Sequence, residues 1–198
     1  MADYTSRTTV KEYLGIPSGT STEDDAIDAA LAAAEDEVDN ICGRTFVVPG
    51  SATAKVFEPT NGVVVEVDDI AQTTGLVVKT DTEDDGDYDT TLTLTSEYVV
   101  EGNAAPYRII RRVDGSTFPR YMSDRPTIEV TAYWGYAMAV PGPIVQAATV
   151  LSARLYQRRS SPLGFQAGMS TEFGPVRISR IDPDIRTLLY GYRRIGVA

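Results

Sequence analysis

Residues 24–46, DDAIDAALAAAEDEVDNICGRTF, contain an apolar ladder with steps of four and three, the spacing of one face of an α-helix. Residues 142–159, GPIVQAATVLSARLYQRR, repeat this pattern after a long β-rich interval. The larger members of the two ladders are Ile27, Leu31, Val38, Ile41, Ile144, Leu151 and Leu155. Because each apolar seam is narrow, we expect the two helices to pack on one another as the core of a small bundle.

The interval between the ladders is predicted to be β-rich. Seven short segments in it are rich in β-branched and aromatic residues and are separated by turn clusters. They are Lys55–Phe57, Val63–Val67, Leu76–Lys79, Thr91–Thr95, Tyr98–Val100, Tyr107–Ile110 and Thr127–Ala132. No helical pattern alternates with these segments, so we expect an antiparallel sandwich or barrel-like insertion.

The predicted fold class is therefore α+β: a small helical bundle, built from two long helices plus short terminal helices, interrupted by the β insertion. We expect residues 1–48 to hold the N-terminal core helices and residues 49–134 the β-rich insertion. The second long core helix falls in residues 135–160, and residues 161–198 form a C-terminal arm with a short helix.

Cap residues mark the expected helix starts. Thr8 or Thr9 is expected to cap a short first helix, and Ser21 or Thr22 the first long helix. Glycines are expected to end both, at Gly15 and at Gly43. In the arm, the pair Asp182-Pro183 is typical of an N-cap followed by proline at the first helical position.

The composition removes several classes of function. The 198 residues include no histidine and a single cysteine, Cys42. Ser-His-Asp and Cys-His catalysis, histidine-built zinc sites, thiolate-rich metal sites and an internal disulfide are therefore excluded. Cys42 fits a reducing compartment and is expected to be buried and unreactive. We expect no cofactor, and the sequence carries neither a signal-peptide pattern nor the ~18 apolar residues of a membrane span.

The charge is distributed unevenly along the chain. Residues 1–140 hold 25 acids and 10 bases, whereas residues 141–198 hold 3 acids and 8 arginines. An arginine-rich end on an acidic body suggests docking on an acidic protein surface or on a neighbouring copy. The alternative is a solvated basic helix face.

Three groups of charged residues resemble sites. Residues 81–89, DTEDDGDYD, match the start of a calcium loop, but Leu92 occupies the twelfth position, where glutamate is required. We expect a solvated hairpin tip there, with ion binding left open. A carboxylate pair for glycoside hydrolysis could come from Glu97, Glu101 and Asp114, although the sequence cannot place them at a required separation.

The third group is a basic and aromatic patch that could meet single-stranded nucleic acid. It comprises Arg108, Arg111, Arg112 and Arg120 with Tyr107, Phe118 and Tyr121. The acidic body would oppose stable phosphate contact, so we expect these arginines to pair with neighbouring acids instead.

The order of several short motifs along nearly the whole chain resembles one family. The motifs are VKEYLGI at 10–16, CGRTF at 42–46, VTAYWGY at 130–136 with Val140-Pro141, residues 147–159, SPLG at 161–164, and IDPDI at 181–185 with Leu188-Leu189. The chain is similar in these features to the head–tail connector proteins of long-tailed bacteriophages, also called adaptor or head completion proteins. The β-rich middle resembles members with an insertion between the two long helices.

This resemblance implies a structural virion protein without enzymatic activity. Members form a homo-oligomeric, dodecameric ring at the head–tail junction of the virion, after synthesis in the host cytoplasm. The ring binds the portal protein on one side and a head–tail stopper or tail terminator protein on the other. It extends the DNA ejection channel, so double-stranded DNA would pass through transiently, and no membrane is involved.

The C-terminal arm is expected to dock on the portal, as the resemblance implies for connector tails. The candidate docking residues are Arg177, Arg180, Arg186, Leu188, Leu189, Tyr192, Arg193 and Arg194. Removing residues 177–198 is expected to abolish portal binding and to leave the body folded.

Two other function classes compete with the connector. The strand-rich middle and its aromatic residues would suit a carbohydrate-binding or adhesion module of a phage particle. The abundant acids would suit a hydrolase. Ring formation or portal binding would favour the connector, and glycan binding or substrate turnover would favour the others.

Overall fold

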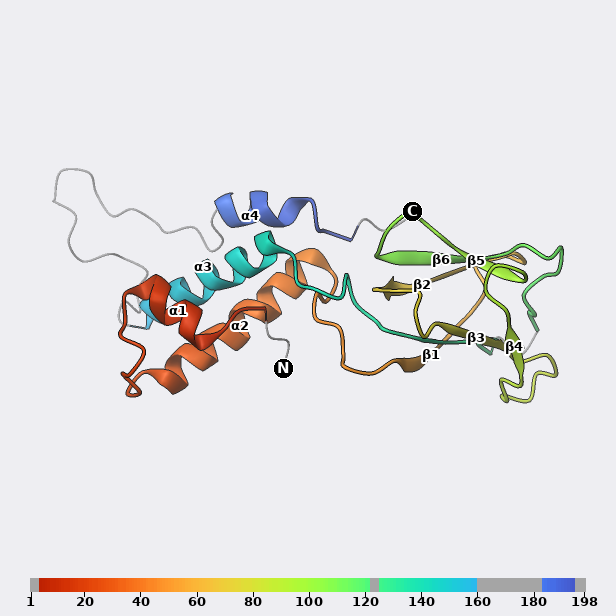
Figure 1. The fold of residues 1–198 in the computed structure, drawn as a ribbon, viewed down its shortest axis with the longest axis horizontal. Coiled ribbons are helices and arrows are strands. Elements are labelled where there is room, and N and C mark those ends of the chain that lie inside the picture. The colour runs from red at the N-terminus through yellow and green to blue at the C-terminus, as the bar shows by residue number, and fades with distance from the viewer. Residues whose placement is uncertain (1–3, 122–124, 160–182, 195–198) are drawn as a thin grey trace. The chain divides into compact units, whose positions relative to one another are not determined.

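The computed structural model describes residues 4–121, 125–159 and 183–194. The chain divides into two compact units: a helical unit of Met1–Phe46 with Val140–Ala198, and a β unit of Val47–Ala139 (Figure 1). The predicted α+β class and antiparallel sheets are confirmed. The borders fall a few residues from those expected at 48/49 and 134/135.

The helical unit contains four described helices: α1 (Arg7–Leu14), α2 (Asp24–Cys42), α3 (Gly142–Arg158) and α4 (Pro183–Tyr190). The long helices α2 and α3 pack along each other, and both α1 and α4 contact each of them (Figure 1). Two chain segments far apart in sequence thus build one core. None of the described helices combines the length and apolar composition that crossing a membrane requires.

The two apolar ladders contribute unequally to this core. Ile27, Val38 and Ile144 are fully buried, and Leu151 is nearly so. The remaining ladder residues, Leu31, Ile41 and Leu155, are half-buried. Small residues complete the seam, since Ala34, Ala147 and Ala148 are fully buried.

The observed start of α1 differs from the predicted cap, whereas the ends of α1 and α2 agree with the prediction. Ser6, rather than Thr8 or Thr9, caps α1, because its Oγ accepts the Thr9 backbone N–H at 3.1 Å. Gly15 and Gly43 end α1 and α2 with φ of 70° and 65°, as predicted, a conformation that costs glycine little.

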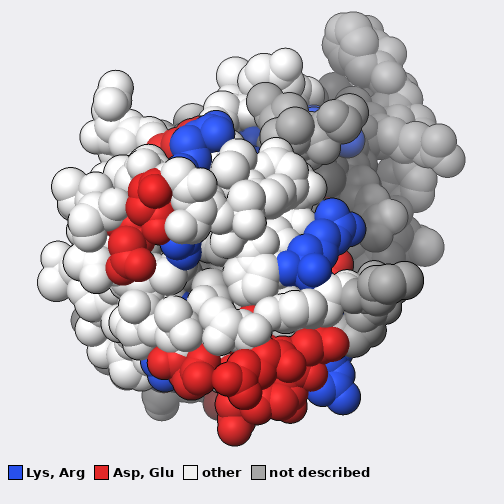
Figure 2. Space-filling view, turned by 90° about the vertical axis from the view of Figure 1, so that its right-hand side faces the viewer, with Lys and Arg blue, Asp and Glu red and all other residues white. Residues whose placement is uncertain are grey.

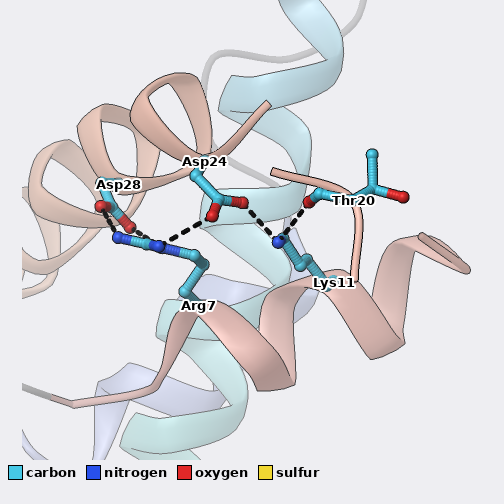
Figure 3. Close-up of polar contacts among 5 residues, drawn as sticks. All are labelled: Arg7, Lys11, Thr20, Asp24 and Asp28. Carbon is cyan, nitrogen blue, oxygen red and sulfur yellow. Dashed lines mark hydrogen bonds and ion pairs between the residues drawn. The ribbon is translucent and has the colours of Figure 1, made fainter. Parts of the chain in front are cut away.

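The start of α2 is stabilised by cations of α1 instead of by Ser21 or Thr22. Glu23 precedes the helix and makes no side-chain cap hydrogen bond. Figure 3 shows Arg7 reaching Asp28 and Asp24, while Lys11 lies between Asp24 and the carbonyl of Thr20. Lys11 is only 4% exposed and donates to the Thr20 oxygen at 2.7 Å. These ion pairs join α1 to the first turn of α2.

The β unit contains seven strands: β1 (Thr53–Phe57), β2 (Val64–Ile70), β3 (Val77–Thr80), β4 (Thr90–Leu92), β5 (Tyr98–Glu101), β6 (Tyr107–Arg112) and β7 (Ile128–Ala132). Each overlaps one predicted segment. They form two antiparallel sheets, in the orders β1-β7-β3-β4 and β2-β6-β5. The described strands do not close into a barrel, so the barrel-like alternative is wrong.

Both sheets contribute to one apolar core. Val65 pairs with Ile110 across one sheet, and Val78 pairs with Val130 across the other, and all four are fully buried. Trp134 joins this core and its indole N–H donates to the carbonyl of Thr53 at 2.8 Å. The alternation of buried and partly exposed residues along the strands is the cause of this arrangement.

Gly135 permits a close backbone approach at the end of the β unit. Its φ is 150°, and a Cβ at this position would lie 2.8 Å from Cγ2 of Val48. Its N–H donates to the carbonyl of Asp69 at 2.8 Å. A side chain here would therefore clash with the neighbouring segment.

Candidate functional site

The C-terminal helix α4 has one buried and one exposed face. Ile185 and Leu189, four residues apart, are buried in the helical unit, which α4 joins by contacting α2 and α3. Arg186, Leu188 and Tyr190 are exposed. A helix of eight residues is too short to be stable alone in water, so its packing determines its stability.

The turn after α4 is anchored at the end of α2. The Tyr192 ring packs edge-on against Phe46, with centroids 6.0 Å apart and planes at 75°. The backbone N–H of Arg194 donates to the carbonyl of Cys42 at 2.7 Å, which satisfies a carbonyl in the last turn of α2. Arg193, between them, is exposed.

The candidate docking residues therefore separate into three groups. Arg186, Leu188 and Arg193 are exposed and accessible to a partner. Leu189 is fully buried and is unavailable to a partner while α4 is packed, and Tyr192 and Arg194 are half-buried in the anchored turn. The remaining two, Arg177 and Arg180, lie outside the described residues.

A groove that the sequence did not reveal lies between the two long helices. Ala33 and Glu37 line it from α2, and Leu151, Leu155 and Arg158 line it from α3. Its volume is about 200 Å³, and most of its lining is apolar. The half-buried state of Leu155 follows from this opening. The ladder predicted a helix–helix seam but could not show where the seam opens to solvent.

Cys42 is buried, as predicted, and its thiol is held in the protonated form. Burial raises the pKa of Cys42 to about 11, although the nearby Arg44 opposes this increase. A thiol with a raised pKa is a poor nucleophile near neutral pH.

Three of the four arginines of the basic and aromatic patch are paired with acids, as predicted, whereas Arg120 is exposed. Arg108 binds Glu66, and Arg111 binds Glu101. Arg112 donates to both carboxylate oxygens of Asp114. These ion pairs neutralise most of the basic patch that could have met nucleic acid.

The acidic run at 81–89 forms the loop between β3 and β4, and its first carboxylate organises the loop. The buried Asp81 accepts backbone N–H groups from Glu83 at 3.0 Å, Asp84 at 2.8 Å and Gly86 at 2.8 Å. Burial acts to raise the pKa of Asp81, but the backbone donors outweigh it and lower the pKa. Asp81 is therefore occupied as a turn-forming anion.

The other acids of this loop are mostly exposed, and Figure 2 shows acidic side chains gathered in one patch at the lower edge of the view. Figure 1 places the β3–β4 loop in that region of the β unit. Within the part of the chain that the structure describes, no group of three or more His, Cys, Asp or Glu residues is arranged to hold a metal ion. A solvated loop tip accounts for this geometry.

The carboxylates considered for hydrolysis each have a structural partner. Glu97 accepts the backbone N–H of Thr93 at 2.6 Å, and the other two bind arginines. The hydrogen bond from Arg112 lowers the pKa of Asp114 to about 2, outweighing the opposing effect of burial. A carboxyl group with so low a pKa remains ionised and cannot act as a general acid near neutral pH.

This ion pair makes the β unit sensitive to acid. The pKa of an unfolded aspartate is about 3.9, so the pairing stabilises the fold above about pH 4. The contribution disappears as the pH falls through the folded-state pKa of about 2. We expect Asp114→Asn to lower the urea concentration at the unfolding midpoint at about pH 6 and to have a much smaller effect near about pH 2. Urea titrations across this range measure the difference, and an equal difference at every pH would contradict the assignment.

Exposed aromatic residues do not gather on the β unit. Its exposed large apolar residues, among those described, are aliphatic or methionine: Val56, Val63, Leu94, Val113 and Met138. The exposed aromatics of the described chain, Tyr13 and Tyr190, belong to the helical unit. The described tyrosines of the β unit that reach its surface are half-buried.

No protein-family model and no curated protein sequence matches the chain. The solved structures that share its fold include the following two. One is from the neck of an empty gene transfer agent (GTA) particle computed with C6 symmetry: identity is 16%, the TM-score is 0.62, and the match covers 100% of this chain and 94% of that chain. The other is from the virion of a native GTA particle: identity is 18%, the TM-score is 0.55, and coverage is 96% and 89%. At these identities the similarity establishes the fold.

Proposed function

We propose that this chain is a structural protein of the neck of a phage-like particle. The observation that carries the proposal is the similarity of the fold, over the full length of this chain, to a chain from a GTA particle neck. A second match, to a chain from a GTA virion, also covers both units. The motif order described above supports the same role independently of the structure.

Within the neck, the chain would form a ring between the portal and the stopper or tail terminator protein. A ring of identical copies has cyclic symmetry, and twelve copies are compatible with the sixfold symmetry used for the similar neck structure. In this position the ring joins head to tail and extends the DNA channel.

Portal docking is assigned to the C-terminal arm. Arg177 and Arg180 supply charge ahead of α4, while Leu188 and Arg193 are exposed on the helix and its turn. The excess of arginine in this part of the chain favours an acidic partner surface.

The portal assignment is tested by binding of the full-length protein to the portal protein of the same particle. Arg177→Glu with Arg180→Glu should weaken binding strongly, because two favourable charge contacts become repulsive. Arg120→Glu, an exposed charge reversal in the β unit, is the matched control and should bind as the wild type does. Unchanged binding by the double variant would contradict the assignment of portal docking to the C-terminal arm.

Double-stranded DNA would pass through the ring without being held. The net charge of −10 and the pairing of three β-unit arginines with acids oppose stable phosphate contact. We expect an anisotropy titration at moderate salt to show at most weak binding that is lost as salt rises. A salt-resistant complex with a preferred sequence would contradict the conduit role.

A further inference from the structure

We propose that copies of this chain join head to tail, with Tyr190 and Arg186 on α4 of one copy docking on the groove between α2 and α3 of the next. This interface rests on the proposed ring and specifies the surfaces that build it. It follows from charge, exposure and shape in the helical unit.

Acidic and basic residues are distributed unevenly in the helical unit. Residues 1–46, which form α1 and α2, hold 10 acids and 3 bases, whereas the half containing α3 and α4 holds most of its arginines. Some charges are matched within the unit, as Arg7 is by Asp24 and Asp28. Exposed acids remain on α2, including Asp25 and Asp36, and exposed arginines remain on and after α4. Such a division favours contact between the acidic half of one copy and the basic half of another.

Tyr190 has the properties of an interface anchor. It is 75% exposed, the highest value among the large apolar residues in the described chain. Arg186 lies four residues before it on the same flank of α4. Tyrosine and arginine dominate binding energy at protein interfaces because each combines large contact area with a polar end.

The groove between α2 and α3 matches this anchor in size and chemistry. Its volume is about 200 Å³, and an apolar cavity of about 150 Å³ accommodates a benzene-sized ring. Ala33, Leu151 and Leu155 offer apolar contact to the tyrosine ring. Glu37 lines the groove from the acidic helix and would pair with the guanidinium of Arg186 from the incoming copy, while Arg158 lines the same groove from α3.

The two surfaces belong to different parts of the same chain, which determines the symmetry of the assembly. Tyr190 is too exposed to occupy the groove of its own copy. A contact between two different surfaces is heterologous, and repeated heterologous contacts close into a ring when the rotation allows it. A twofold dimer would instead bring identical surfaces together.

The first experiment compares two exposed tyrosines of the helical unit. Sedimentation velocity of the full-length protein over a range of concentrations measures its assembly. We expect Tyr190→Ala to raise the concentration needed for assembly by about tenfold or more. Tyr13→Ala, which removes a ring that is 55% exposed outside the proposed contact, should assemble as the wild type does. Wild-type assembly by Tyr190→Ala would overturn the interface.

The second experiment reverses the proposed ion pair. Arg186→Glu and Glu37→Arg should each weaken assembly of the pure variant by placing like charges in contact. An equimolar mixture should recover assembly, because the two variants then alternate and every interface contains opposite charges. A mixture that stays as weak as the separate variants would contradict the pairing. A wild-type protein that stays monomeric, both alone and with portal protein, would contradict the proposed ring. Equal assembly of the wild type and all variants would contradict only the proposed interface.

Discussion

Replacing Phe46 with alanine should lower the free energy of unfolding of the helical unit by about 3–5 kcal/mol, the usual cost of removing a buried aromatic side chain. Phe46 is fully buried at the point where both ends of the described chain meet α2. Its ring lies 5.8 Å from that of Tyr4 and 6.0 Å from that of Tyr192, both edge-on. Its N–H also donates to the Tyr4 hydroxyl at 2.9 Å.

The loss arises from two aromatic contacts that share the Phe46 ring, because the backbone N–H of residue 46 is unchanged by the substitution. Alanine would leave a cavity between the two tyrosines and remove both aromatic pairs. Chemical denaturation followed by far-UV circular dichroism measures the change, and Phe46→Leu should recover part of it by refilling the space. A decrease in the free energy of unfolding below about 1 kcal/mol would show that the contacts of Phe46 with Tyr4 and Tyr192 contribute little to stability.

Replacing Leu189 with alanine should cost about 2–5 kcal/mol and loosen α4 from the bundle. Leu189 is fully buried, and with Ile185 it forms the face of α4 that packs in the helical unit. An eight-residue helix has little stability of its own, so losing one of two anchors affects the whole element.

The adjacent residue provides the control for this prediction. Leu188 has the same side chain and lies on the same helix, but it is 36% exposed. Leu188→Ala should change stability by no more than about 0.5 kcal/mol. Amide hydrogen exchange of residues 183–194 should increase in Leu189→Ala and not in Leu188→Ala. Equal effects of the two substitutions would contradict the packing of α4.

The burial of Leu189 also changes the interpretation of a C-terminal deletion. Removing residues 177–198 would remove the buried side chains of Ile185 and Leu189. It would also remove the contact of the Tyr192 ring with Phe46 and the hydrogen bond from Arg194 to the carbonyl of Cys42. We therefore expect the deletion to destabilise the body, so a loss of portal binding in the truncated protein would not identify a docking surface. Surface substitutions separate the two effects.

The sequence predicted those parts of the fold that depend on local pattern. Strands β1 to β7 each fall on a predicted segment, since alternation of β-branched residues and turn clusters are local signals. The apolar ladders predicted α2 and α3 for the same reason. The ends of α1 and α2 were marked correctly by Gly15 and Gly43, because a left-handed residue has a strong local preference for glycine.

Features that depend on distant contacts were not predictable in this way. The start of α2 is stabilised by Arg7 and Lys11 from another helix, so no local cap motif was needed. Tyr4 is buried, and its N–H and hydroxyl donate to Glu35 and Asp39, far along the chain. No spacing pattern connects these residues.

The candidate site shows the same limit. The excess of arginine indicated a docking region, but only the fold separates the exposed Leu188 from the buried Leu189. The periodicity of α4 was compatible with this outcome, since Ile185 and Leu189 are one helical turn apart. The groove between α2 and α3 depends on side chains from both helices and has no signature in either segment.

Electron microscopy of the full-length protein mixed with the portal protein of its particle tests the neck assignment most directly. The account predicts a ring of this chain stacked on the portal, with twelve copies and a central channel. Class averages of the mixture would show the added ring, and the mass of the complex would give the copy number. A chain that stays monomeric at high concentration and leaves the portal undecorated would contradict the assignment.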